Sequence, residues 1–402
     1  MTPELVSLDD IRDAAQRLAG VIQSTPVEPS RAASDAAGVR TLLKCEHLQR
    51  TGSFKLRGAY NRIARLGDAE RSRGVVCASA GNHAQGVALS ASLAQVAATV
   101  FMPAAAPLPK VQATRGYGAE VVLAGDSFDD AYEASQKWAA ENGAVFVHPF
   151  DHRDVIAGQG TLGLEIVDEV PDVATVVVPV GGGGLIAGVA TAVRALRPGC
   201  RVVGVQAAGA AAFPASLAAG QPCSLAQVST IADGIAVRTP GALALAHVRE
   251  RVDEVVTVSD EAIARAVLML VERAKQVVEP AGAAGLAAVL ERAGLLVEPV
   301  VVLLAGGNVD PLLLVRIVQS GMFEEGRYFA FRTRLADRPG ALSRLLAVLA
   351  EAGANILAVE HHRLGTRLGV LEVEVQLEVE TRGPDHIRRV VEALRGHDYP
   401  VA

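Results

Sequence analysis

The chain has 402 residues, of which 50% are hydrophobic and 20% charged, and its formal net charge is -6 at pH 7. This length predicts two or three domains, and the lack of a basic block argues against nucleic acid or anionic membranes as partners. No apolar run is long enough to span a bilayer, and the first five residues lack the pattern of a signal peptide. Four scattered cysteines without C-x-x-C spacing predict reduced core thiols and a cytoplasmic protein.

The first part of the chain predicts strands that alternate with helices. An amphipathic helix at 7–22 and a strand at 41–44 precede a helix at 54–66, which begins beside Lys55. Such alternation is typical of βαβ units with a parallel sheet. The further elements expected here are strands at 74–78, 97–102, 120–123 and 145–147 and helices at 83–96, 110–117 and 128–142.

A second α/β unit follows. Its strands read as continuous Val and Leu runs, which predict a sheet covered by helices on both faces. Ligands bind at the carboxyl ends of the strands in such sheets, so the glycine-rich turns after residues 78, 179 and 304 predict one shared site. The expected elements are helices at 159–170, 185–196 and 261–277 and strands at 175–178, 201–205 and 300–304.

The last 80 or so residues predict a separate α+β module after a linker at 322–328. The order strand, helix, strand, strand, helix is expected, and the sequence allows a short last strand at 399–402. This order is ferredoxin-like, a fold that by itself says nothing about function. The strands are expected at 329–335, 356–361 and 370–378 and the helices at 341–352 and 384–394.

One lysine in this chain has the surroundings of a reactive amine. Lys55 lies between Phe54 and Leu56, after a glycine and two hydroxyl residues. Desolvation would lower its pKa and make it a nucleophile or a base. The alternative is an ordinary helix residue whose ammonium reaches solvent.

Two further stretches are candidate anion-binding sites. The run Gly181–Gly184 lies between a predicted strand and helix, where its backbone N–H groups could bind a phosphate. The alternative is a flexible turn or a close contact between helix and strand. No Walker lysine accompanies the run, which argues against a nucleoside triphosphate. Residues 79–86 also open a helix and offer a second anion site.

Taken together, S-F-K-L-R-G-A at 53–59, S-A-G-N-H-A-Q-G at 79–86, G-G-G-G-L at 181–185 and A-G-G-N at 305–308 resemble fold-type II pyridoxal-phosphate (PLP) enzymes. The closest resemblance is to the threonine dehydratases, over roughly residues 10–320. The segment D-R-P-G-A-L from Asp337, with G-A-N-I at 353–356, resembles ACT domains, which bind amino acids.

The resemblance implies an α/β fold. It has two doubly wound parallel-sheet domains, as in the β subunit of tryptophan synthase, and a C-terminal α+β ferredoxin-like ACT domain. Residues 1–321 would be the catalytic region, with a small α/β subdomain at about 52–155 inserted in the large one. Residues 329–402 would be the regulatory domain.

The same resemblance assigns roles to individual residues. Lys55 would form the Schiff base with PLP and then remove the Cα proton of the substrate. Cofactor contacts are assigned to Phe54, Lys55, Asn82, Gly181, Gly182, Gly183, Gly184, Leu185, Gly234, Glu279 and Ala305. Substrate contacts are assigned to Ser79, Ala80, Gly81, Asn82 and His83, and effector contacts to Gly340, Ala341, Leu342, Asn355 and Ile356.

Some of these positions allow a second role, and others differ from the residue that the family usually has. His83 could act as an acid or base or only pack beside the site, and Glu279 could merely cap a helix. Ala80 stands where serine racemases have a proton-donating Ser, which favours a dehydratase. Ala305 replaces the usual Ser, Thr or Cys that hydrogen-bonds the pyridine nitrogen. Gln206 and the residues after it offer no carboxylate for the divalent ion of related enzymes, so no metal is expected.

The resemblance therefore implies a threonine ammonia-lyase that converts L-threonine to 2-oxobutanoate and ammonia, with L-serine to pyruvate as a side activity. A role in isoleucine biosynthesis, regulation by isoleucine or valine, and a homotetramer or homodimer are also implied. The alternatives are a serine racemase or another PLP-dependent β-eliminase, and an amino-acid sensor whose PLP site has decayed.

Overall fold

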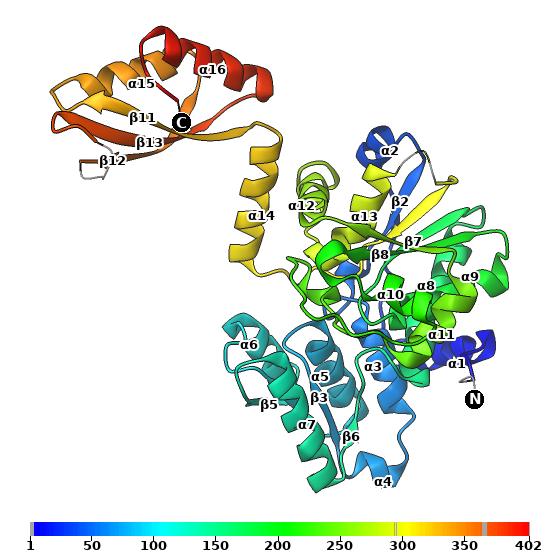
Figure 1. Cartoon of the computed structure of the whole chain (residues 1–402). Coiled ribbons are helices and arrows are strands. Elements are labelled where there is room, and N and C mark those ends of the chain that lie inside the picture. The colour runs from blue at the N-terminus through cyan, green and yellow to red at the C-terminus, as the bar shows by residue number, and fades with distance from the viewer. Residues whose placement is uncertain (1–3, 293, 295, 364–367, 402) are drawn as a thin grey trace. The chain divides into compact units, whose positions relative to one another are not determined.

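The computed structural model describes residues 4–292, 294, 296–363 and 368–401 (Figure 1). Residues 1–3 and residue 402 lie outside the described residues. The first three belong to the stretch that lacks a signal-peptide pattern, and residue 402 would end the short last strand that the sequence allows. The chain forms two compact units, Met1–Asp310 and Pro311–Ala402. In the described part of the chain, no helix is both long and apolar enough to cross a membrane.

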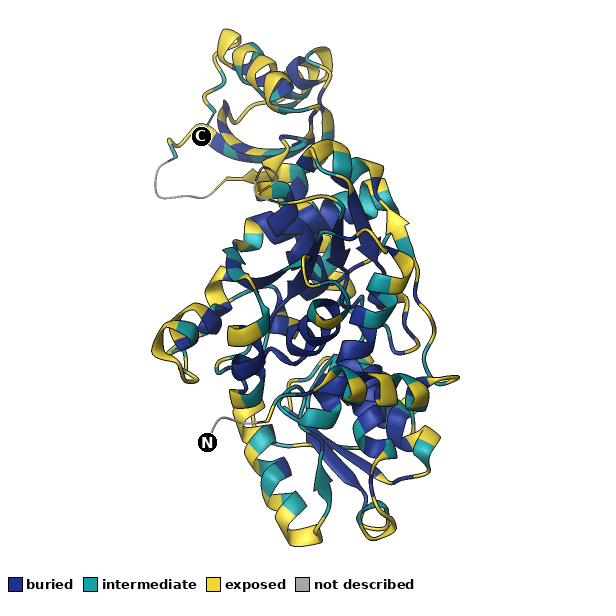
Figure 2. Cartoon of the chain, turned by 90° about the vertical axis from the view of Figure 1, so that its right-hand side faces the viewer, coloured by how far each residue is buried: buried dark blue, intermediate teal, exposed yellow. Residues whose placement is uncertain are grey.

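A six-stranded sheet is the centre of the first unit, and Figure 2 shows its inner strands as buried. The first strand pairs antiparallel with the second, and the other neighbours pair in parallel. The predicted strands at 41–44, 175–178, 201–205 and 300–304 are confirmed, whereas the first and last strands of the sheet were not predicted. In spatial order the strands are β1 (Val27–Pro29), β2 (Thr41–Lys44), β10 (Val300–Leu303), β7 (Thr175–Pro179), β8 (Arg201–Ala207) and β9 (Glu254–Val258).

Helices cover both faces of this sheet, as the apolar strands predict. Val176 and Val178 of β7 share a core cluster with residues of the helix after the glycine run. Val177 faces the other side, where a Cβ added to Gly285 would meet it at 3.5 Å. The helices are α1 (Leu8–Leu18), α2 (Arg31–Ala37), α8 (Arg153–Glu169), α9 (Gly184–Leu196), α10 (Ala212–Ala219), α11 (Ala242–Arg251), α12 (Asp260–Met269) and α13 (Pro280–Glu291).

Short helical turns connect these elements at several places. Among them are the 3₁₀ turns η1 (Glu46–Leu48), η2 (Ala208–Ala210) and η3 (Asp233–Ile235). Another, η4 (Leu270–Ala274), is a π-helical turn followed by Lys275, whose φ is 60°. The helix predicted at 261–277 therefore stops before residue 277.

A second, four-stranded parallel sheet occupies the chain between β2 and β7. The four strands predicted for the first α/β region are confirmed, with small changes at their ends. In spatial order they are β5 (Glu120–Leu123), β4 (Ala98–Met102), β3 (Val75–Ala78) and β6 (Val145–Phe146), and all pair in parallel. The helices of this region are α3 (Lys55–Ala64), α4 (Asp68–Arg71), α5 (Asn82–Ala94), α6 (Leu108–Gly116) and α7 (Phe128–Asn142).

The ends of α7 show why the sequence specifies this helix so well. Ser127 accepts a hydrogen bond from the backbone N–H of Asp130, and the Asp130 side chain accepts one from the Ser127 backbone. Gly143, with a φ of 64°, adopts the left-handed conformation that ends a helix. Both signals are readable in the sequence, and the predicted bounds of this helix match the observed ones.

The second unit contains a three-stranded antiparallel sheet in the order β11, β13, β12. The predicted order of strand, helix, strand, strand and helix is confirmed. Residues 322–324, predicted to be linker, form the last turn of a helix, and residues 399–401 are not in a strand. The elements are α14 (Pro311–Glu324), β11 (Tyr328–Ala336), α15 (Ala341–Glu351), β12 (Asn355–His362), β13 (Glu372–Glu380) and α16 (Pro384–Gly396).

Candidate active site

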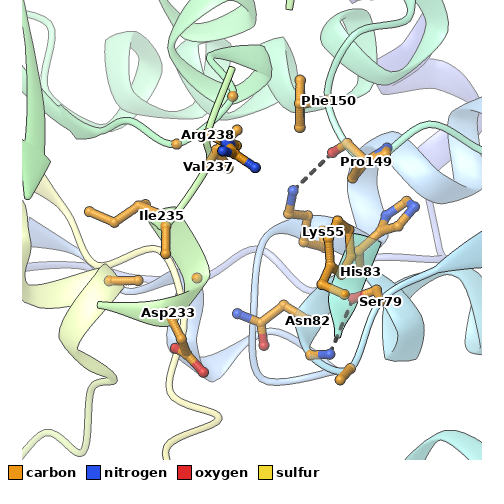
Figure 3. Close-up of a pocket in the computed structure, with 18 of the residues that line it drawn as sticks. Lys55, Ser79, Asn82, His83, Pro149, Phe150, Asp233, Ile235, Val237 and Arg238 are labelled. Carbon is orange, nitrogen blue, oxygen red and sulfur yellow. Dashed lines mark hydrogen bonds between the residues drawn. The ribbon is translucent and has the colours of Figure 1, made fainter. Parts of the chain in front are cut away.

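A cavity of about 870 Å³ lies in the first unit (Figure 3), and its walls include residues at or just after the carboxyl ends of β3, β7 and β10. The structure therefore brings together segments that lie more than 200 residues apart in sequence. The residues predicted for the cofactor and the substrate all line this one cavity: Phe54, Lys55, Ser79, Ala80, Gly81, Asn82, His83, Gly181, Gly182, Gly183, Gly184, Leu185, Gly234, Glu279 and Ala305.

Lys55 is the first residue of α3, and its amine points into the cavity. The Nζ atom donates a hydrogen bond of 2.8 Å to the carbonyl of Pro149, as Figure 3 shows, and lies 5.2 Å from the centroid of the Phe54 ring. Burial lowers the pKa of Lys55 from 10.5 to about 8, against the opposing effect of the Glu279 carboxylate. More of this amine is therefore neutral near neutral pH than in an ordinary lysine, although the ammonium still predominates there, and the neutral form is the one that acts as a nucleophile or base.

Asn82 is fixed from two sides at the start of α5. Its Nδ2 donates to Oε1 of Glu279 over 2.6 Å, and its Oδ1 accepts from Nδ2 of Asn308 over 2.8 Å. Glu279 is the residue just before α13, but its carboxylate turns into the cavity. Burial raises the pKa of Glu279 to about 7, and the charge of Asp233 adds to this rise, while the bond from Asn82 opposes it. Glu279 thus titrates near neutral pH at the cavity wall.

His83 lines the cavity, but its ring is already engaged. Its Nε2 lies 2.8 Å from the carbonyl oxygen of Val147, so this nitrogen must carry the proton and donate it. Burial, together with the nearby charge of Lys55, lowers the pKa of His83 to about 3. A ring that stays neutral and donates to the backbone fits the interpretation of His83 as a packed residue better than that of an acid.

The glycine run leaves no room for side chains. Gly183 has a φ of 96°, a left-handed conformation, and a Cβ on it would lie 2.5 Å from Cζ of Phe213. A Cβ on Gly182 would lie 2.4 Å from ring atoms of Phe150. The run therefore presents bare backbone to the cavity at the N-terminus of α9, where the helix dipole favours an anion.

Comparison with known proteins identifies this arrangement. The family model described as pyridoxal-phosphate dependent enzyme matches residues 18–307. The chain belongs to this family of PLP-dependent enzymes. The model of the ACT domain matches residues 330–396.

Full-length and structural relatives agree with this assignment. The L-threonine ammonia-lyase of Thermotoga maritima is 46% identical over 397 residues, which are 99% of each chain. The structure of the processed form of threonine deaminase isoform 2 from Solanum lycopersicum is 35% identical, with a TM-score of 0.76 over 80% of this chain and 92% of that one. The structure of maize serine racemase is 37% identical, with a TM-score of 0.74 over 80% of this chain and 100% of that one.

The residues of the cavity fit PLP. The Lys55 amine suits an aldehyde, and the bare backbone of Gly181–Gly184 at a helix N-terminus suits the phosphate. Gly234 lines the cavity close to Glu279, and a Cβ on it would lie 2.9 Å from Cβ of Ala281. Ala305 also lies at the wall, where its methyl group can offer no hydrogen bond to the ring nitrogen of this PLP enzyme.

Sequence reasoning missed two ion pairs at the cavity wall. Lys110 of α6 lies 3.0 Å from Asp233 of η3, and Arg238 lies 3.7 Å from Asp129 of α7. Each pair joins the region of the four-stranded sheet to the segment around Gly234. The partners of the first pair are 123 residues apart in sequence, and no local signal could have paired them.

Across residues 4–292, 294, 296–363 and 368–401, no group of three or more His, Cys, Asp or Glu side chains is placed to hold a metal ion.

The predicted effector residues of the ACT domain fall into two separate groups. Gly340, with a φ of 82°, Ala341 and Leu342 form the start of α15, just after β11. Asn355 and Ile356 begin β12, and Asn355 pairs with Glu380, whereas the end of β11 at Ala336 pairs with Glu372. Glu372 and Glu380 are eight residues apart along β13, which corresponds to about 26 Å at about 3.3 Å per residue. One copy of the chain therefore does not bring the two groups into a single site.

Proposed function

We propose that this chain is a PLP-dependent L-threonine ammonia-lyase that forms 2-oxobutanoate and ammonia, and that acts on L-serine to give pyruvate as a side reaction. The observation that carries the proposal is the Lys55 amine, which shares one cavity with the glycine run and the start of α5. The nearly full-length similarity to an L-threonine ammonia-lyase supports the choice of substrate. We place the enzyme in the cytoplasm, in keeping with its four free cysteines.

Lys55 has two tasks in this proposal. It would hold the cofactor covalently, and its amine, when free and neutral, would remove the Cα proton of the substrate. PLP, when bound, withdraws electrons from the substrate and so makes that proton acidic. The carbonyl of Pro149 accepts a hydrogen bond from the free amine over 2.8 Å and keeps it within the cavity.

Two helix N-termini hold the anionic groups. The backbone of Gly181–Gly184 at the start of α9 binds the phosphate, and residues 79–83 at the start of α5 bind the carboxylate of the substrate. Ser79 accepts a hydrogen bond from the Gly81 backbone over 3.1 Å, which leaves its hydroxyl proton free to donate to that carboxylate. Holding the carboxylate fixes which bond of Cα faces Lys55.

The test is the initial rate of 2-oxo acid formation from L-threonine. Lys55→Ala should abolish the rate and the visible absorbance of the covalently bound cofactor. Lys137→Ala, on a side chain of α7 that is 77% exposed, is the matched control and should change neither. A Lys55→Ala protein with full activity would refute the proposal, and a wild-type protein that takes up no PLP would favour the amino-acid sensor.

The likeness to maize serine racemase makes racemisation the second candidate. Racemisation through two faces of the substrate needs a proton donor opposite Lys55, and the family position for it is Ala80, whose methyl group lines the cavity. We therefore expect no D-serine when L-serine is the substrate. Chiral analysis of the products would detect it, and its appearance would favour the racemase.

We further propose that the ACT domain senses isoleucine or valine and that the enzyme works in isoleucine biosynthesis. Because β11 ends and β12 begins at opposite ends of β13, about 26 Å apart along that strand, we infer that a site using both groups of effector residues joins two copies. The proposal thus includes a homodimer or homotetramer. The test is the rate with and without each amino acid, together with the mass in solution. A rate indifferent to both would remove the feedback role.

A further inference from the structure

The glycine run needs an external support, because four successive glycines have no side chains to hold them and lose much entropy on ordering. Two aromatic residues pack against the run. Phe150 lies against Gly182 and Gly184, and Phe213 of α10 lies against Gly183. Phe213 is fully buried and packs against Gly183, the one residue of the run with a positive φ.

Gln206, the side chain that fixes Phe213, lies at the end of β8. Its Oε1 accepts a hydrogen bond of 2.9 Å from the backbone N–H of Phe213. Its Nε2 donates to the carbonyl of Ala210 over 3.2 Å and to that of Val180 over 3.4 Å. Val180 directly precedes Gly181, so a single carboxamide joins the residue before the run to the start of α10.

The site requires a carboxamide for a simple reason. Gln206 is 0% exposed, and the three backbone groups around it comprise one donor and two acceptors. A carboxamide supplies the complementary acceptor and two donors. An apolar side chain of equal length would leave all three groups buried without this partner, and an ionised carboxylate would face two carbonyl oxygens.

We propose that Gln206 is a positioning residue that holds the glycine run in the conformation that binds the cofactor phosphate. This inference rests on the proposed assignment of Gly181–Gly184 to the phosphate. It predicts a defect with a particular chemical signature. Loss of Gln206 should weaken the binding of the phosphate while leaving the reaction of Lys55 with an aldehyde intact.

The experiment compares two ligands with the cofactor-free protein, PLP and pyridoxal, which has the same aldehyde and ring but no phosphate. The dissociation constant of pyridoxal divided by that of PLP reports the contribution of the phosphate to binding. Gln206→Met should reduce this ratio about tenfold or more, through weaker binding of PLP, because it removes all three hydrogen bonds at nearly constant volume. An unchanged ratio in Gln206→Met would overturn the proposal.

A matched control lies at the opposite end of β7. Thr175 is also fully buried, and its Oγ1 donates a hydrogen bond of 2.7 Å to the carbonyl of Val297. Thr175→Val should lower stability and leave the ratio as in the wild type. A ratio that falls equally in Thr175→Val would reduce Gln206 to a general structural role and would overturn the proposal.

Gln206→Glu keeps the experiment decisive if Gln206→Met fails to fold. The protonated carboxyl group can still donate to one carbonyl, whereas the ionised form repels both. The ratio should therefore fall with rising pH more steeply in Gln206→Glu than in the wild type. If the ratio of the variant and that of the wild type change in the same way with pH, the proposal is overturned. Equal binding of PLP and pyridoxal by the wild type would instead show that the glycine run does not bind the phosphate.

Discussion

Replacing Lys55 by Met should stabilise the cofactor-free protein near neutral pH. Burial lowers the pKa of Lys55 from 10.5 to about 8, so the folded chain holds the ammonium at a cost. Between these two pH values the unfolded chain binds more protons than the folded one, and stability rises with pH. Well below pH 8 the Lys55 amine is protonated in both the folded and the unfolded chain, and the full cost of burying the ammonium is present. Methionine has similar length and no charge, so it removes this cost.

The two pKa values set the size of the effect. Their difference corresponds to about 3 kcal/mol as an upper value, at about 1.4 kcal/mol for each pH unit. The substitution also removes the hydrogen bond from Lys55 to Pro149, which reduces the net gain. We therefore expect Lys55→Met to raise the free energy of unfolding by about 1–3 kcal/mol at pH 7, and this gain should decline as the pH approaches 10.5.

Urea unfolding of the cofactor-free proteins at pH 7 and pH 10 measures this gain. The comparison is best repeated with Glu279→Gln in both proteins, because the charge of Lys55 lowers the pKa of Glu279 and its loss would alter that titration. A Lys55→Met protein that is no more stable than the wild type at pH 7 would refute the reasoning. A gain that stays constant between the two pH values would show that packing, not charge, is responsible.

Three further changes test other parts of the site. Asp233→Asn should lower the pKa of Glu279 below about 7, because the Asp233 charge raises it, and should shift the corresponding limb of the pH–rate profile to lower pH; an unmoved profile would contradict this. Ala80→Ser adds a hydroxyl that can transfer protons, so D-serine should become detectable by chiral analysis, and its continued absence would argue against Ala80 as the deciding residue. Arg57→Met removes the partner of the fully buried Glu46, 2.8 Å away, and should cost about 3–5 kcal/mol in urea unfolding, whereas a loss below 1 kcal/mol would count against a buried pair.

The sequence allows most of the fold to be predicted, because its strands are short Val and Leu runs and its helices carry clear end signals. Helix α13 escapes prediction for a physical reason. Its sequence, P-A-G-A-A-G-L-A-A-V-L-E, is buried on nearly every side, so it has no polar face and no helical periodicity. The early start of α8 at Arg153, instead of the predicted residue 159, has a similar cause, since residues 155–163 are all buried.

The candidate site is predictable at the level of its motifs and not at the level of its charges. Each motif follows a strand, and parallel strands bring their carboxyl ends to one edge. The hydrogen bond between Asn82 and Glu279, and the raised pKa of Glu279, depend on contacts between distant segments. The role of Gln206 is equally hidden, because a lone Gln after a strand gives no sign of which backbone groups it will meet.

The position of β10 in the centre of the six-stranded sheet has a consequence for synthesis on the ribosome. β10 pairs with β2 on one side and β7 on the other, although it is the last strand of the sheet to be made. At about 5–20 residues per second, the ribosome needs roughly 13–50 s to extend the chain from Lys44 to Val300. During this time the sheet exists as two halves with open edges, whereas the four-stranded sheet at residues 75–146 can already close. Nascent chains that stall before β10 should therefore expose strand edges that can pair with other chains.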